Sequence, residues 1–169
     1  SGQFVAAEAR EAARRRDRPR LAAMREAAQA TGHPLLPWVE YWDLGSRLTE
    51  AKAEEVDAFF ERWRGSYLED RLRNDWLLEL GRRRDWAAIS REFPRFRMND
   101  DREVTCWWLL TEHLQGRDVR DAARQAWFAQ QWDQLLERAQ RHHPYVSPHG
   151  APRGRQGRHK QSKAHNLLR

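Results

Sequence analysis

The sequence of 169 residues lacks several features that mark membrane proteins and disulfide-stabilised proteins. It has a single cysteine, Cys106, so no disulfide can form within the chain. No run of uncharged apolar residues is long enough to form a membrane-spanning helix. Alternation of β-branched and polar residues is also missing, which argues against strands. Cys106 lies in an apolar stretch beside Trp107, so we interpret it as a small buried side chain and not as a nucleophile.

Acidic residues are missing from the end of the chain, and this decides how the net charge of +6 is read. Eight of the 31 basic residues follow Glu137, where no Asp or Glu occurs, so residues 1–137 carry 23 basic against 25 acidic side chains. The basicity therefore belongs to the tail, and the folded part is not expected to have a basic groove for specific nucleic-acid binding. Residues 142–169 are rich in Pro, Gly, Arg and His without apolar periodicity, which predicts disorder.

What the chain does have is the composition of a packed domain. Hydrophobic residues make up 40% of it and charged residues 33%, and there are 9 tryptophans. This length allows one domain with a sizeable core. The tryptophan content favours packing over disorder even though the mean hydropathy is -1.01.

Helical periodicity runs through residues 4–128 in pairs of segments. Leu68, Leu72, Trp76 and Leu80 are four residues apart and so share one helix face. We expect Gly81 to end that helix in a left-handed conformation and Asp85 to cap the next one. The expected helices cover about residues 4–15, 18–30, 34–44, 51–63, 68–80, 86–93, 99–115 and 119–127, with one more over about 131–141.

The helix pairs repeat along the chain. Gly81 and Gly116 are 35 residues apart, and Asp85 and Asp118 are 33 apart. A period near 34 with two helices per unit is typical of tetratricopeptide-like repeats, in which each hairpin buries its apolar face against the next. We therefore predict an all-α fold of stacked helical hairpins that forms a right-handed superhelix over residues 1–141, followed by a basic disordered tail over 142–169.

Several residues invite a functional interpretation, and each also has a structural one. The tryptophans could form a platform for sugars, but most lie on helical stripes and are expected in the core; Trp108 and Trp132 are the candidates for exposure. The acidic cluster is explained by a helix N-terminus more simply than by catalysis or cation binding; it comprises Asp100, Asp101 and Glu103. Arg14, Arg15 and Arg16 are expected to form a solvated helix end.

The histidines near and within the tail could bind a transition metal, but flexible spacing gives no fixed geometry; they are His142, His143, His149, His159 and His165. We therefore predict no catalytic residue, no cofactor and no metal site. Attraction of the tail's basic residues to nucleic acid or anionic wall polymers would be nonspecific and salt-dependent.

Three segments, in order and with fitting spacing, resemble the N-terminal superhelical region of soluble lytic murein transglycosylases of the Slt type. The first is His33-Pro-Leu-Leu-Pro-Trp-Val-Glu-Tyr-Trp-Asp-Leu44, and the second is Tyr67-Leu-Glu-Asp-Arg-Leu-Arg-Asn-Asp-Trp-Leu-Leu-Glu-Leu-Gly81 followed by Asp85-Trp86. The third is Asn99-Asp-Asp-Arg-Glu-Val-Thr-Cys-Trp-Trp108, followed by Ala122-Ala-Arg-Gln-Ala-Trp-Phe128. The resemblance covers about residues 4 to 128.

The resemblance implies a periplasmic protein that acts on peptidoglycan. Enzymes of this family cleave the bond between N-acetylmuramic acid and N-acetylglucosamine in a separate catalytic domain and leave a 1,6-anhydro product. One Glu, usually followed by Ser, acts there first as acid and then as base. This sequence has no Glu-Ser dipeptide and no Gly-Leu-Met-Gln-like segment, so no catalytic position transfers and we expect no activity from the chain alone.

The resemblance stops near Gln130, which suggests a truncated or frame-shifted continuation. The given sequence contains no signal peptide, so for an exported protein we expect it to be a mature or trimmed form. The implied role is a scaffold region that engages peptidoglycan or cell-wall enzymes. Two alternatives stay open: a tetratricopeptide-like adaptor that binds a protein partner, and a nucleic-acid binder that works through the basic tail. The oligomeric state is open as well.

Overall fold

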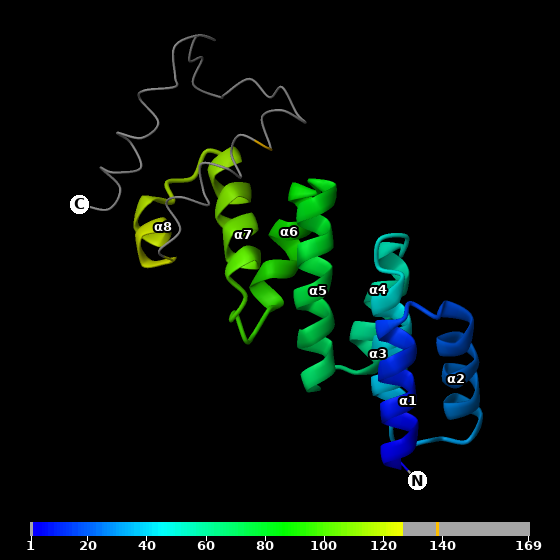
Figure 1. Ribbon diagram of the computed structural model, residues 1–169. Coiled ribbons are helices and arrows are strands. Elements are labelled where there is room, and N and C mark those ends of the chain that lie inside the picture. The colour runs from blue at the N-terminus through cyan, green and yellow to red at the C-terminus, as the bar shows by residue number, and fades with distance from the viewer. Residues whose placement is uncertain (1, 127–137, 139–169) are drawn as a thin grey trace. The chain divides into compact units, whose positions relative to one another are not determined.

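The fold is known from a computed structural model, which describes residues 2–126 and Arg138. Every regular element in this part of the chain is a helix, so the expected all-α class is confirmed (Figure 1). Within the same residues, no helix combines the length and the apolar character that crossing a bilayer would need.

Eight α-helices and one 3-10 turn follow one another in the described part of the chain. They are α1 (Gly2–Arg14), α2 (Arg18–Ala30), α3 (Leu36–Ser46), α4 (Ala53–Arg62), α5 (Tyr67–Arg83), α6 (Trp86–Glu92), η1 (Phe93–Arg95), α7 (Arg102–Leu114) and α8 (Arg120–Ala126). The odd-numbered α-helices begin 34, 31 and 35 residues apart, and the even-numbered ones 35, 33 and 34 apart. The period near 34 is thus present in the helix starts, while the superhelical path stays a prediction.

Aspartates open three of these helices, and the sequence predicts one of the three caps, Asp85. The Asp17 carboxylate accepts a hydrogen bond from the Arg20 backbone N–H, and Asp85 accepts one from that of Ala88. Asp101 accepts from the N–H groups of Glu103 and Val104. These bonds satisfy N–H groups that have no partner within the first helical turn. Helix α7 begins at Arg102, directly after its cap Asp101 and slightly later than expected. Asn99 lies outside the helix, because its φ of 45° is left-handed.

Four helices end in the same hydrogen-bond pattern. A residue with positive φ donates its N–H to the carbonyl three residues back, and the next residue donates to the carbonyl five back; the four are Arg16, Gly32, Arg84 and Gly116. This is the Schellman arrangement. The sequence-based prediction that Gly81 ends α5 is wrong, because α5 continues to Arg83 and Arg84 takes the left-handed conformation, with φ 59°.

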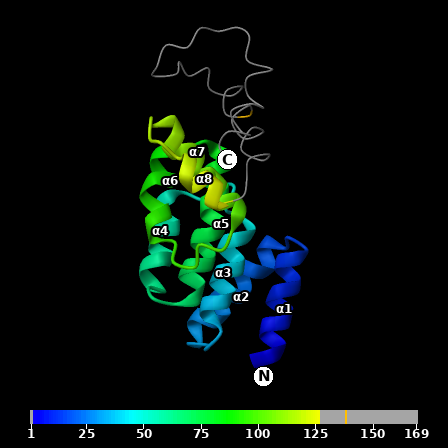
Figure 2. The ribbon, with the colours of Figure 1, turned by 90° about the vertical axis from the view of Figure 1, so that its left-hand side faces the viewer.

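The chain divides into two compact units, Ser1–Glu79 and Leu80–Arg169, with the division inside α5. In the first unit, α1, α2 and α3 pack against one another. Their buried core is small and aliphatic, and Met24 and Trp42 pack at its edge; the core residues are Ala9, Ala12, Leu21 and Val39. Figure 2 shows these three helices from a second side. The predicted α5 face is confirmed as buried, with Leu68, Leu72, Trp76 and Leu80 at most 4% exposed.

In the second unit, α6 packs on α7, and α7 contacts α8. The Trp86 and Trp107 rings lie 6.3 Å apart between centroids. The Phe93 and Trp108 rings stack at 4.6 Å with an interplanar angle of 8°. Aromatic pairs of this kind add to the stabilisation that comes from area burial alone.

Candidate functional site

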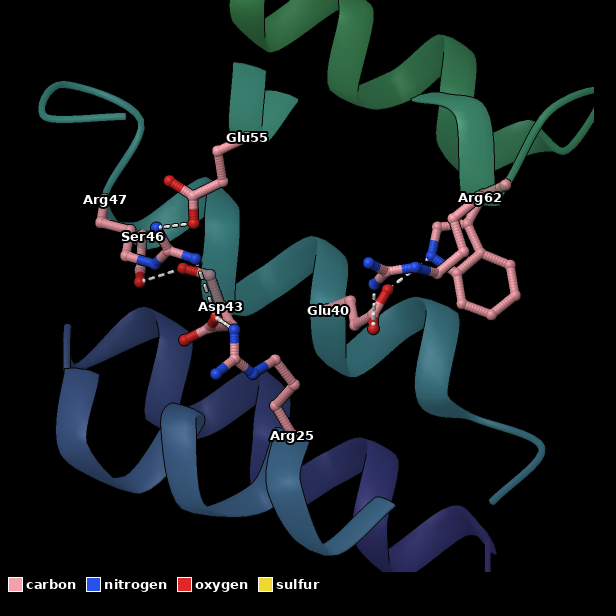
Figure 3. Close-up of polar contacts among 8 residues, drawn as sticks. Arg25, Glu40, Asp43, Ser46, Arg47, Glu55 and Arg62 are labelled. Atoms are coloured by element: carbon pink, nitrogen blue, oxygen red, sulfur yellow. Dashed lines mark hydrogen bonds and ion pairs between the residues drawn. The ribbon is translucent and has the colours of Figure 1, made fainter. Parts of the chain in front are cut away.

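Helix α3 exposes an indole and buries two carboxylates. Trp38 is 37% exposed, whereas Glu40 and Asp43 are only 5% and 3% exposed. A surface helix ordinarily does the reverse, and a buried charge or an exposed large apolar group is the informative exception. The arrangement is stable only because each carboxylate has partners on a neighbouring helix (Figure 3).

Glu40 ties α3 to α4. Its two carboxylate oxygens accept hydrogen bonds from Arg62 Nη1 and Trp63 Nε1, both at 2.6 Å. Ionised acceptors make the stronger class of hydrogen bond, which offsets the cost of burying the charge. The indole N–H of Trp63 is thus used in a hydrogen bond within the fold, and the indole is half-buried.

Asp43 ties α3 to α2 and to its own C-terminal turn. Its Oδ2 lies 3.5 Å from Arg25 Nη1 and 3.2 Å from Arg47 Nη2. Arg47 also pairs with Glu55 of α4 (Figure 3). The Ser46 hydroxyl donates to the Asp43 backbone carbonyl at 2.7 Å. Together with the Glu40 contacts, these bonds fix the rotation of α3 and so decide which of its side chains face outward.

Four aromatic side chains, here called the aromatic surface, lie together on this anchored helix and at the start of α5: Trp38, Tyr41, Trp42 and Tyr67. Trp38 and Tyr67 are exposed, whereas Tyr41 and Trp42 are half-buried. The Trp38 ring is central, with its centroid 5.5 Å from Trp42, 6.4 Å from Tyr41 and 6.3 Å from Tyr67. Tyr67 is 58% exposed. Because Trp38 and Tyr67 are the only large hydrophobic side chains counted as exposed in the described residues, the exposed aromatic area is concentrated here.

A polar edge borders the aromatic surface. The Tyr41 hydroxyl donates to Asp75 Oδ2 at 2.6 Å, and the Asn74 side chain approaches the other oxygen of Asp75 at 3.4 Å. Burial raises the pKa of the Tyr41 phenol above its usual range, and the hydrogen bond to Asp75 and the charge of Asp75 raise it further. Tyr41 is therefore a neutral donor, and Asp75 a half-buried acceptor, beside exposed rings.

Flat rings beside fixed polar groups can bind a ligand that has both an apolar face and hydroxyl or amide groups. Pyranose sugars have this combination, since the C–H bonds of one ring face are apolar and the hydroxyls lie at the rim. In the described part of the chain, no group of three His, Cys, Asp or Glu side chains is arranged to hold a metal ion.

No family model, curated protein or solved structure matches this chain.

The tryptophans that the sequence singled out for exposure are not seen as free surface rings. Trp108 is half-buried and stacked on Phe93, so the structure does not present it as a free platform. Trp132 lies outside the described residues. Of the remaining described tryptophans, Trp76 and Trp107 are in the core, as expected. Trp42, Trp63 and Trp86 are half-buried, and Trp38 is the one described tryptophan whose indole is exposed, so core packing holds for fewer tryptophans than expected.

The acidic cluster and Cys106 have structural roles. Asp101 caps α7, while Asp100 and Glu103 are exposed around the start of that helix. Cys106 is 1% exposed, and burial raises the pKa of its thiol to about 11, with Glu103 and Asp101 adding to the effect. A thiol that stays protonated is not an activated nucleophile, so the interpretation of Cys106 as a small buried side chain is confirmed.

Arg14, Arg15 and Arg16 are exposed at the end of α1, as predicted, and the first two pair with Glu11. The candidate histidines of the tail lie outside the described residues, as does the whole of 142–169. Sequence reasoning overlooked Tyr67 as a surface residue. Its signal was available: Tyr67 precedes the Leu68 stripe by one position and so falls off the buried face.

Proposed function

We propose that this chain is a helical scaffold region of a periplasmic lytic transglycosylase, and that it holds peptidoglycan without cleaving it. The observation that carries the proposal is the inverted helix α3, which keeps Trp38 at the surface at the expense of burying Glu40 and Asp43. The resemblance of residues 4–128 to the superhelical region of Slt-type enzymes supplies the wall polymer as the ligand. In this role the aromatic surface stacks against sugar rings of the glycan strand, and the catalytic step belongs to another domain.

The affinity that one ring supplies can be approximated from its area. An aromatic side chain offers roughly 150–250 Å². If a sugar covers about a quarter of that, about 50 Å² of apolar surface leaves water, which contributes about 1 kcal/mol at about 25 cal/mol per Å². Each ring is then worth roughly a fivefold change in affinity. Loss of both exposed rings is expected to weaken binding by roughly 25-fold if the two contributions add.

The test is retention of the full chain on purified peptidoglycan sacculi at about 0.5 M salt, where exposed ionic attraction by the basic tail is screened. The double variant Trp38→Ala and Tyr67→Ala is expected to lose most of its retention. The matched control, Trp38→Phe with Tyr67→Phe, keeps two flat rings and should bind nearly as well as the parent. A peptidoglycan zymogram of the chain is expected to show no clearing. Equal retention of the alanine and phenylalanine pairs would contradict the role of the aromatic surface.

A second candidate function, a tetratricopeptide-like adaptor for a protein partner, is favoured by the period near 34 of the helix starts. Adaptor repeats bind peptides on their helix faces rather than sugars. The two functions separate in the same experiment. If the chain is an adaptor, neither the unmodified chain nor either double variant is retained on sacculi at high salt. The chain instead retains one defined protein in stoichiometric amount.

A further inference from the structure

Two hydrogen-bond donors in the second unit are buried, and neither has an acceptor among the residues that the structure describes. They are Nε of Arg84, directly after α5, and Nε1 of Trp107 in α7. The two side chains are in contact, since the central carbon of the Arg84 guanidinium lies 4.7 Å from the centre of the Trp107 ring. Trp107 is 5% exposed. Buried polar groups in proteins are nearly always paired, so two unpaired donors at one place call for a common acceptor.

The Arg84 guanidinium is held by one nitrogen and leaves one edge unused. Its Nη1 donates to the backbone carbonyls of Gly81, at 2.7 Å, and of Arg82, at 3.1 Å. Nε and Nη2 form the side edge, and in the described part of the chain neither donates to any acceptor. Nε is buried while the whole side chain is only half-buried, so this edge is approached from its Nη2 end. Two parallel N–H groups of this kind match two oxygens of one oxyanion.

The charges that act on Arg84 are positive. Burial lowers the pKa of its guanidinium, and the charges of Arg138 and Arg82 lower it further. Among the described residues, no carboxylate pairs with Arg84. The guanidinium still carries its proton, because an arginine is not deprotonated in a protein. A half-buried cation with cationic neighbours is stabilised more by an anion than by a neutral acceptor such as water.

We propose that Arg84 and Trp107 form a binding site for an oxyanion, the phosphate or carboxylate group of a ligand, at the C-terminal end of α5. Two oxygens of the group accept from the Nε–Nη2 edge of Arg84, and one of them also accepts from the indole N–H. Gly81 allows this arrangement, because a Cβ there would meet the Trp107 ring at 2.5 Å, so the indole lies directly on α5. The site does not depend on the proposed function, which rests on the aromatic surface.

The test records the indole N–H signals of the full chain by two-dimensional proton–nitrogen NMR at neutral pH. Sodium phosphate and sodium acetate are titrated separately, with sodium chloride keeping the ionic strength constant. The Trp107 signal is assigned by its loss in Trp107→Phe. We expect this signal to move and saturate with one or both anions in the millimolar range. The anion that saturates at the lower concentration identifies the group, phosphate or carboxylate.

Variants of the arginines separate a built site from general attraction to positive charge. Arg84→Gln should weaken binding about tenfold, because it removes the charge and the paired N–H groups. Arg84→Lys keeps the charge without the fork and should also bind more weakly than the parent. The matched control is Arg83→Gln, which removes an exposed arginine one position earlier and should leave the affinity within about twofold of the parent.

Trp107→Phe tests the indole N–H itself, with the Arg84 Nε–H signal as the readout. The variant keeps an aromatic ring and should weaken binding about two- to tenfold, the scale of one neutral hydrogen bond. A Trp107 signal that neither anion moves would overturn the inference and would assign the acceptor to water. Equal affinities of Arg84→Gln and Arg83→Gln, or movement without saturation, would overturn it as well.

Discussion

Gly81 offers the sharpest test of the packing. It lies inside α5, and a Cβ built there would meet three atoms of the Trp107 ring at 2.5–2.6 Å. Ordinary van der Waals contact begins at 3.4 Å, so the indole would have to move by about 0.9 Å. Trp107 is only 5% exposed and is covered by the Arg84 guanidinium, 4.7 Å from the ring, so it has little room to move.

Two opposing effects set the size of the change in Gly81→Ala. Alanine in a helix interior is favoured over glycine by about 0.5–1 kcal/mol. Overpacking of a close-packed core costs about 1–3 kcal/mol. The overpacking term is expected to win, since the contact is with a rigid ring and involves three atoms. The net result is a loss of roughly 1–2 kcal/mol of the free energy of unfolding.

Gly45 of α3 is the matched control. It is helical and exposed, and a Cβ there would meet nothing within 4 Å, so Gly45→Ala should show the propensity gain without the clash. Urea unfolding followed by circular dichroism and by tryptophan fluorescence measures both variants. We expect Gly45→Ala to gain about 0.5–1 kcal/mol and Gly81→Ala to lose stability. A gain in both variants would refute the close approach of Trp107 to α5.

Two further predictions concern single polar groups. Asp101→Ala should lower the free energy of unfolding, measured with urea, by about 0.5–2 kcal/mol, because Asp101 caps α7. Asp100→Ala removes an exposed neighbour and should lower it far less. Equal losses in the two variants would contradict the cap. Because folding raises the pKa of Tyr41, its contact with Asp75 contributes fully to the free energy of unfolding below about pH 10, the ordinary tyrosine pKa. That contribution falls as the pH rises above this value. Ultraviolet titration should show one tyrosine ionising only at higher pH or on unfolding, and Tyr41→Phe should remove that late transition.

Local sequence signals determined most of the secondary structure. The period of four in Leu68, Leu72 and Trp76 predicted the buried face of α5, and Asp85 marked the start of α6. These predictions succeeded because helix periodicity and capping depend on residues within one or two turns of each other. The spacing of glycines and aspartates likewise indicated helix pairs with a period near 34, which the helix starts follow.

Tertiary contacts decided what local patterns left undetermined. Leu35, Trp38, Val39 and Trp42 all fit one broad apolar stripe, so the sequence placed Trp38 in the core. The partners that turn it outward are Arg25 on α2 and Arg62 on α4, and no local rule pairs them with Asp43 and Glu40. Gly81 is a similar case, since its neighbour Trp107 is on α7. A helix's own sequence fixes that it forms and roughly where it ends, but the charges and rings of other helices fix its rotation. That rotation is what puts an aromatic surface on this protein.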